Sequence, residues 1–125
     1  MQRNHFLIIA ALLGMSAVVF GAFGAHLLEK MLEPHMLQRF HTGVEYQFYH
    51  TAALLAVAVL WEKQAHRWLG FAAYGFIIGT VLFSGSLYVY SLTGIVAIAM
   101  ITPIGGTAFI LGWLFLLLYA LTARR

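Results

Sequence analysis

Four long apolar runs, separated by short polar stretches, dominate this sequence. They cover about residues 6–28, 44–61, 68–92 and 95–121. A membrane-spanning helix needs about 20 predominantly apolar residues, so each run is long enough to cross a bilayer. None shows the period-two alternation that marks the strands of a membrane barrel. The sequence therefore predicts an all-α integral membrane four-helix bundle that forms a single domain over residues 1–125.

The composition fits lipid, rather than water, as the surrounding solvent. Hydrophobic residues make up 62% of the chain and charged residues 9%, whereas soluble domains carry about 25% charged residues. The four runs leave no room for a soluble catalytic domain. The chain has no cysteine, which excludes disulfides and thiol chemistry. It has no long basic run either, so we expect no nucleic-acid partner.

The basic residues predict which side of the membrane holds the chain ends. With four crossings, the N-terminus, residues 62–67 and the C-terminus share one side, and that side carries five of the seven Lys and Arg residues. The positive-inside rule then places both termini in the cytoplasm. Trp61, Trp68 and Trp113 fall near the cytoplasmic ends of their runs, as expected for residues that prefer the membrane interface.

The stretch between the first two runs is amphipathic. Its apolar residues recur every four positions, at Leu32, Met36, Phe40 and Val44. Glu33-Pro34 suits a helix start, because proline is favoured in the first turn, and Gly43 could mark a bend. We predict a short amphipathic helix lying along the outer interface. The alternative is that the second spanning helix begins earlier, as one long helix.

Small residues on three of the runs predict close packing between helices. Helices in lipid associate through residues that let their backbones approach. The glycines expected at such contacts are Gly14, Gly21, Gly24, Gly75, Gly79, Gly85, Gly105, Gly106 and Gly112. Pro103 lies inside the fourth run, where it removes a helix hydrogen bond and predicts a bent or broken turn.

Polar residues of the four runs fall together when the runs are aligned by depth, using a helix rise of about 1.5 Å per residue. They gather in the outer half of the bundle, away from the termini, and are His26, Glu45, Gln47, His50, Ser84, Ser86, Tyr88 and Thr102. We favour the interpretation that they hydrogen-bond across helices, as small polar residues commonly do in membranes. The other interpretation is a site for an ion, a proton or a lipid head group, lined by His26, Glu45 and His50.

No catalytic or metal-binding pattern accompanies this cluster. The sequence lacks a nucleophile motif, a phosphate-binding loop, a carboxylate dyad and a paired-histidine metal motif, so we predict no metal and no cofactor. Our leading hypothesis is a non-enzymatic protein that binds membrane lipids or partners and supports membrane integrity, as a homo-oligomer or a subunit of a larger complex. The alternative is a small transporter or channel component that uses the polar cluster. A third hypothesis is an electron carrier with haem between His26 and His50.

Four motifs in chain order resemble those of a known family. They are Gly21-Ala22-Phe23-Gly24-Ala25-His26, Glu45-Tyr46-Gln47-Phe48-Tyr49-His50-Thr51-Ala52, Gly85-Ser86-Leu87-Tyr88, and Pro103-Ile104-Gly105-Gly106 followed by Gly112-Trp113. In these motifs the chain is similar to the family known as domain of unknown function 423, which comprises small bacterial inner-membrane proteins and resembles eukaryotic transmembrane protein 256. The resemblance implies four membrane helices in the bacterial plasma (inner) membrane and supplies no agreed activity.

Overall fold

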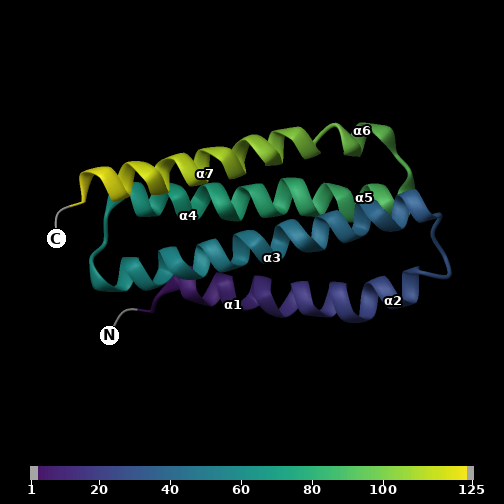
Figure 1. Ribbon diagram of the computed structural model, residues 1–125, viewed down its shortest axis with the longest axis horizontal. Helices are drawn as coiled ribbons and strands as arrows, with labels where there is room; N and C mark the ends of the chain where they lie inside the picture. The colour runs from purple at the N-terminus through teal and green to yellow at the C-terminus, as the bar shows by residue number, and fades with distance from the viewer. Residues whose placement is uncertain (1–2, 124–125) are drawn as a thin grey trace.

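The computed structural model describes residues 3–123 of the chain, and all regular structure in this range is helical. Four helical segments lie side by side and alternate in direction (Figure 1). The start of the first segment and the end of the last therefore lie at the same end of the molecule, which we call the terminal end. We call the opposite end the loop end.

Short helical elements make up three of the four segments. In chain order the elements are α1 (His5–Val18), η1 (Val19–Gly24), α2 (Ala25–Leu28), α3 (Pro34–Lys63), α4 (Arg67–Gly79), η2 (Thr80–Ser84), α5 (Gly85–Thr93), α6 (Val96–Ala99) and α7 (Thr102–Thr122). The first segment contains α1, η1 and α2; the second is α3; the third runs from α4 to α5; and the fourth contains α6 and α7. The elements η1 and η2 are π-helical turns, which widen a helix locally.

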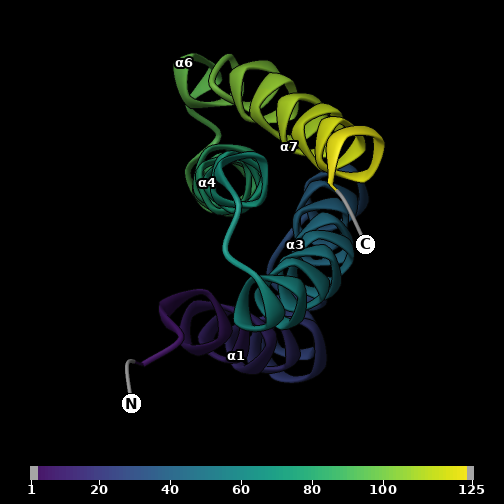
Figure 2. The same ribbon diagram turned by 90° about the vertical axis from the view of Figure 1, so that its left-hand side faces the viewer.

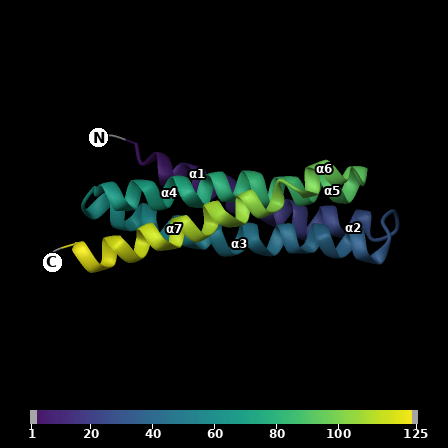
Figure 3. The ribbon, with the colours of Figure 1, turned by 90° about the horizontal axis from the view of Figure 1, so that it is seen from above.

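The α3 helix is the central element of this arrangement. It packs against α1 and also against α4, η2 and α5, while α4 packs in turn on α7. Seen along the helices, α1 and α7 lie on opposite sides of the molecule, with α3 and α4 between them (Figure 2). The α7 helix runs obliquely across the third segment (Figure 3). Polar groups on α3 are therefore placed to contact the other segments.

Three of the four segments are long and apolar enough to cross a membrane: His5–Leu28, Arg67–Thr93 and Val96–Thr122. Their most apolar stretches have mean hydropathies of 2.5, 1.6 and 2.0. The α3 helix is not among them, because its first half carries Arg39, Glu45 and several histidines. Much of the outer surface is apolar, and Met15, Leu27 and Ile110 are 62%, 69% and 69% exposed. Segments that are apolar on their outer faces fit a surrounding of lipid.

The predicted separate interfacial helix is wrong, and the alternative of one long helix is what the structure shows. The α3 helix begins at Pro34, after the extended residue Glu33, and continues to Lys63 without a break. Its first turns bury their apolar face within the protein, since Phe40 and Val44 are 4% and 6% exposed and cluster with residues of α2. That face therefore packs against protein and is not free to lie on a lipid surface.

The backbone of the fourth segment is irregular just before Pro103. The α6 helix ends at Ala99 and α7 begins at Thr102, so Pro103 lies in the first turn of α7. In that position its missing N–H removes no helix hydrogen bond. Gly94 ends α5 with a φ of 72°, a left-handed conformation that glycine adopts without steric cost. These two residues shape the turn that returns the chain from α5 to α7.

Candidate functional site

Gln47 on α3 joins α3 to the helices on either side of it. Its amide nitrogen donates to the Leu13 carbonyl and to the Ser16 hydroxyl, both at 2.8 Å. Its amide oxygen accepts a hydrogen bond from the Tyr88 hydroxyl at 2.6 Å. Gln47 is 3% exposed. The side-chain amide of Gln47 therefore bonds to α1 and α5, and neither its nitrogen nor its oxygen faces an open cavity.

His50, one turn further along α3, is fixed by contacts on both ring nitrogens. Nδ1 lies 2.8 Å from the Tyr46 carbonyl, and Nε2 accepts from the Trp113 indole N–H at 3.1 Å. Because an indole N–H can only donate, the hydrogen-bond network assigns the ring proton to Nδ1 and makes the imidazole neutral. The ring also stacks on Phe109, with centroids 3.5 Å apart. Neither nitrogen keeps a lone pair free for haem iron, so this residue does not fit a haem ligand.

Serines on the third segment make two further contacts between segments. The Ser84 hydroxyl is fully buried and donates to the Gly43 carbonyl on α3 at 2.6 Å. The Ser86 and Thr102 hydroxyls lie 2.5 Å apart and join α5 to α7. Of the eight polar residues named from the sequence, six therefore take part in hydrogen bonds between segments: Gln47, His50, Ser84, Ser86, Tyr88 and Thr102.

The structure does not bring His26 and Glu45 into this network. His26 is exposed on α2, near the loop end. Glu45 is exposed on α3, and its carboxylate accepts a hydrogen bond of 3.3 Å from Tyr49, one turn away on the same helix. His26, Glu45 and His50 therefore do not line a common site. The Glu45 carboxylate lies on the outer surface of α3, apart from this network.

Glycines on α4 and α7 allow the closest approach between helices. A Cβ added at Gly75 would lie 2.7 Å from the Gly112 Cα, closer than real Cβ atoms approach. At Gly105, an added Cβ would collide with the backbone of Phe83, and at Gly79 it would collide with the Phe109 ring.

The remaining predicted glycines differ in how closely they are packed. An added Cβ would be 3.0 Å from Val44 at Gly21 and 3.3 Å from Phe40 at Gly24. Gly14 and Gly106 have only ordinary van der Waals neighbours, and nothing lies within 4 Å of the Cβ position at Gly85. Close packing therefore concentrates between α4 and α7, with a second contact between η1 and α3.

Sequence reasoning missed the aromatic residues that surround His50. The Trp113 indole, although 47% exposed, lies beside His50 and Phe76, with the Phe76 and Trp113 centroids 5.0 Å apart. Phe109 and Trp113 are separated by four residues, so they lie on one face of α7. That spacing was the available signal, but in an apolar helix it does not reveal which face points inward.

Charged groups make few contacts in the described residues. Within the described residues 3–123, one contact joins a carboxylate to a basic side chain: the Glu33 carboxylate lies 3.3 Å from the His35 ring, on the surface. Over the same range, no three His, Asp or Glu side chains come close enough to hold a metal ion. The arrangement at the centre is thus a set of hydrogen bonds between segments together with stacked aromatic rings.

Comparison with known proteins supports the resemblance seen in the motifs. The family model described as a protein of unknown function (DUF423) matches residues 20–106. The UPF0382 inner membrane protein YgdD of Escherichia coli K12 is 39% identical over 125 residues, covering all of this chain and 95% of the relative. The UPF0382 membrane protein YwdK of Bacillus subtilis is 43% identical, covering 92% and 94%. A Haemophilus influenzae relative is 43% identical, covering 90% of each. No solved structure matches.

Proposed function

Because the chain belongs to the DUF423 family of proteins of unknown function, whose relatives are named membrane proteins, we propose that it acts by binding a partner helix in the bilayer. The proposal includes four crossings, with α3 spanning alongside the three apolar segments, and both termini in the cytoplasm. It includes no catalytic step.

The contacts of α3 support its crossing despite its polar residues. Gln47 and His50 face neighbouring helices and are 3% and 6% exposed, so they meet protein and not lipid. A helix packed between segments that cross the membrane has the same depth as its neighbours. The charge bias of the sequence, with five of seven basic residues in the N-terminus, residues 62–67 and the C-terminus, supports the cytoplasmic placement of the terminal end.

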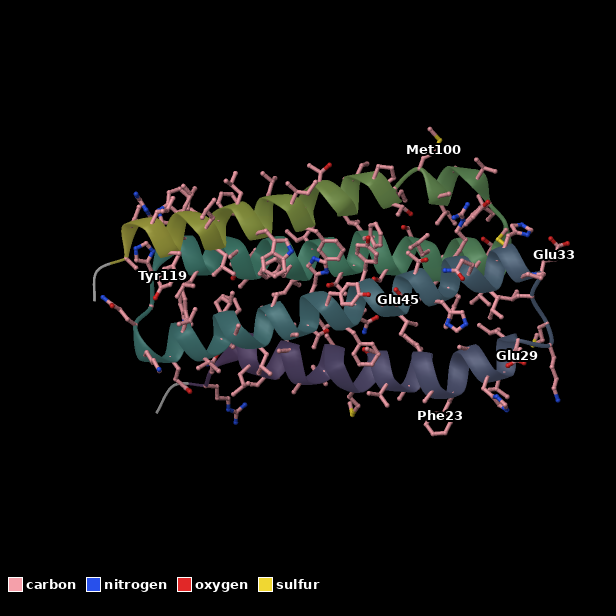
Figure 4. All side chains as sticks on the ribbon, viewed as in Figure 1. Phe23, Glu29, Glu33, Glu45, Met100 and Tyr119 are labelled. Atoms are coloured by element: carbon pink, nitrogen blue, oxygen red, sulfur yellow. The ribbon has the colours of Figure 1, made fainter. Side chains whose placement is uncertain are left out.

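Glu45 is the observation that carries the proposal. It lies about 5 Å from the midpoint of α3 at a rise of about 1.5 Å per residue, well within a hydrocarbon core about 30 Å thick. Its side chain is exposed, and it lies far from Glu29 and Glu33 at the loop end (Figure 4). An ionisable residue at this depth costs about 2.5–3.5 kcal/mol. The single Tyr49 hydroxyl at 3.3 Å offsets only part of that cost, so we infer that a polar partner covers it.

The surface around Glu45 has the form of a helix-docking face. Spacings of four, three and four residues place four exposed residues on one side of α3: Glu45, Tyr49, Ala52 and Ala56. Two alanines one turn apart let another helix approach closely, which is how helices associate in lipid. Glu45 and Tyr49 then supply an acceptor and a donor beside the close contact. We call these four residues the α3 open face.

Cysteine cross-linking tests this proposal, because the chain has no cysteine of its own. In native membranes, Ala52→Cys should give a cross-linked product with a short thiol-to-amine or thiol-to-thiol reagent. A product of twice the monomer mass identifies a second copy, and any other mass identifies a different partner. Val81→Cys is the matched control, since Val81 is 62% exposed on the third segment and lies away from the open face.

Adding Glu45→Leu to Ala52→Cys should abolish the product while leaving the amount of protein in the membrane unchanged. Equal cross-linking at positions 52 and 81, or monomer alone at both, would contradict the proposal. The transport alternative is tested separately in liposomes. Proton or metal-ion flux that stops with His50→Ala would favour transport over partner binding.

A further inference from the structure

A cavity of about 660 Å³ opens at the terminal end of the molecule, between the first segment, α3 and α4. It is lined by Arg3, His5, Phe6, Trp61 and Tyr74. The buried Phe6 ring makes edge-on contacts with the Trp61 and Tyr74 rings, at centroid separations of 5.1 and 5.7 Å. The volume is within the range of about 300–1,000 Å³ that is typical of ligand pockets. The lining thus combines three aromatic rings with the Arg3 and His5 side chains, and we call the polar part of this lining the rim.

Asn4 fixes the position of this rim. Its side-chain amide donates to the Ala58 carbonyl on α3 at 3.0 Å, and its side-chain oxygen accepts from the Leu7 N–H at 3.1 Å. Asn4 therefore caps α1 and ties the start of that helix to the last turns of α3. Because Arg3 and His5 flank Asn4 in the chain, the same contacts hold both side chains beside Trp61.

The donors around the cavity are available to a ligand. Within residues 3–123, no ion pair involves Arg3, and no side-chain hydrogen bond occupies Arg3, His5, Trp61 or Tyr74. Guanidinium, imidazole, indole and phenol groups all carry a hydrogen to donate. A smaller cavity of about 310 Å³ adjoins, shares Arg3 and Trp61, and adds Lys63 together with Glu62. The balance of charge on the rim is positive, so the complementary ligand is an anion.

The rest of the surface indicates which anion fits. Ile78 on α4 and Val81 on η2 follow Tyr74 along the third segment, and they are 49% and 62% exposed. An apolar strip thus leads away from the cavity along the third segment. The head group of a membrane lipid lies near the end of a spanning helix, and its acyl chains lie along that helix. A free phosphate has no acyl chains that could contact the apolar strip.

We propose that this cavity binds the phosphate head group of an anionic phospholipid, with Arg3 as its main ionic contact and the acyl chains lying along α4. Basic pockets between membrane helices on the cytoplasmic side are known as sites for anionic lipid head groups. The site depends on the proposed function only for the membrane placement of the terminal end. It does not involve the α3 open face.

Native mass spectrometry of the full chain in mild detergent tests the site, with phosphatidylglycerol and phosphatidylcholine as the probes. We expect wild type to retain phosphatidylglycerol in preference to phosphatidylcholine. Arg3→Gln should weaken phosphatidylglycerol binding by about tenfold, because it removes the charge-assisted hydrogen bonds from the exposed guanidinium to the phosphate. Arg3 is exposed, so folding should be unaffected. Arg67→Gln is the matched control: it removes one charge at the same end from a side chain that stacks on Trp68 outside the cavity.

Each other outcome counts against the site in a distinct way. Equal weakening by Arg3→Gln and Arg67→Gln would show general attraction to the basic end and would overturn it. Release of bound lipid by an equal concentration of inorganic phosphate would show a free-phosphate site and would overturn the lipid assignment. If Arg3→Gln leaves lipid selectivity unchanged while Ala52→Cys still cross-links, the head-group site is wrong and the proposed function stands. Failure of both experiments would remove both.

Discussion

Replacing Gln47 with leucine should destabilise the protein by about 2 kcal/mol. Leucine has nearly the same size, so the change removes hydrogen bonds and leaves the packing largely intact. The three bonds lost are those to the Leu13 carbonyl, the Ser16 hydroxyl and the Tyr88 hydroxyl. Interhelical hydrogen bonds in membranes contribute about 0.6 kcal/mol each on average, and the half-buried Tyr88 hydroxyl loses its partner as well, which adds to the cost.

The free energy of unfolding can be measured by denaturant titration in bicelles. Gln38→Leu is the matched control, because Gln38 lies on the same helix with an exposed side chain. The double variant Gln47→Leu with Tyr88→Phe should cost less than the sum of the single changes by about 0.6 kcal/mol, since both remove the same bond. If Gln47→Leu costs no more than Gln38→Leu, or if the two changes at Gln47 and Tyr88 are strictly additive, the packing role assigned to this network is wrong.

Three further predictions concern the Thr51 hydroxyl, two glycines and the side of the membrane that holds the termini. Thr51→Val should raise the free energy of unfolding by about 1 kcal/mol, because the Thr51 hydroxyl is buried without a partner; a loss of stability would show that the hydroxyl has one. Gly105→Ala should lower stability by about 1–3 kcal/mol, because the added methyl collides with the Phe83 backbone, whereas Gly85→Ala, with open space, should be neutral or slightly stabilising. Alkaline phosphatase fused to the C-terminus should be inactive in cells and a fluorescent protein fused there should fluoresce, and the reverse result would place the termini outside.

The sequence predicts the ends of a helix closely where the thickness of the bilayer sets the helix length. The runs at 6–28, 68–92 and 95–121 differ by one residue at most from the segments His5–Leu28, Arg67–Thr93 and Val96–Thr122. The sequence does not predict the start of α3 in the same way. A periodic pattern shows that residues 32–44 are helical and amphipathic, but it does not show whether Phe40 and Val44 face lipid or protein.

Contacts between helices were harder to predict, because apolar helices carry little information on their rotation. In a soluble protein, polar residues mark the outside of a helix. Here both sides of α7 are apolar, so nothing in the sequence shows that the Trp113 indole N–H reaches His50. The π-turn η2 adds a second difficulty. It changes which side of the segment each residue faces between Phe76 and Gly85. Even if the orientation of α4 were predicted correctly, the directions of Ser84 and Ser86 would therefore be predicted wrongly.

The two sides of α3 lead to a final expectation that separates folding from binding. The inner side uses Gln47 and His50 in satisfied hydrogen bonds, while the outer side leaves Glu45 facing outward with one weak contact. Glu45→Leu should therefore leave the free energy of unfolding of the isolated chain unchanged or raise it, since it removes a carboxylate from an apolar surface. The same change should abolish cross-linking at Ala52→Cys, whereas Gln47→Leu should lower stability and keep the cross-link. If Glu45→Leu instead unfolds the isolated chain, its carboxylate supports the fold of this chain and the α3 open face is not a docking surface.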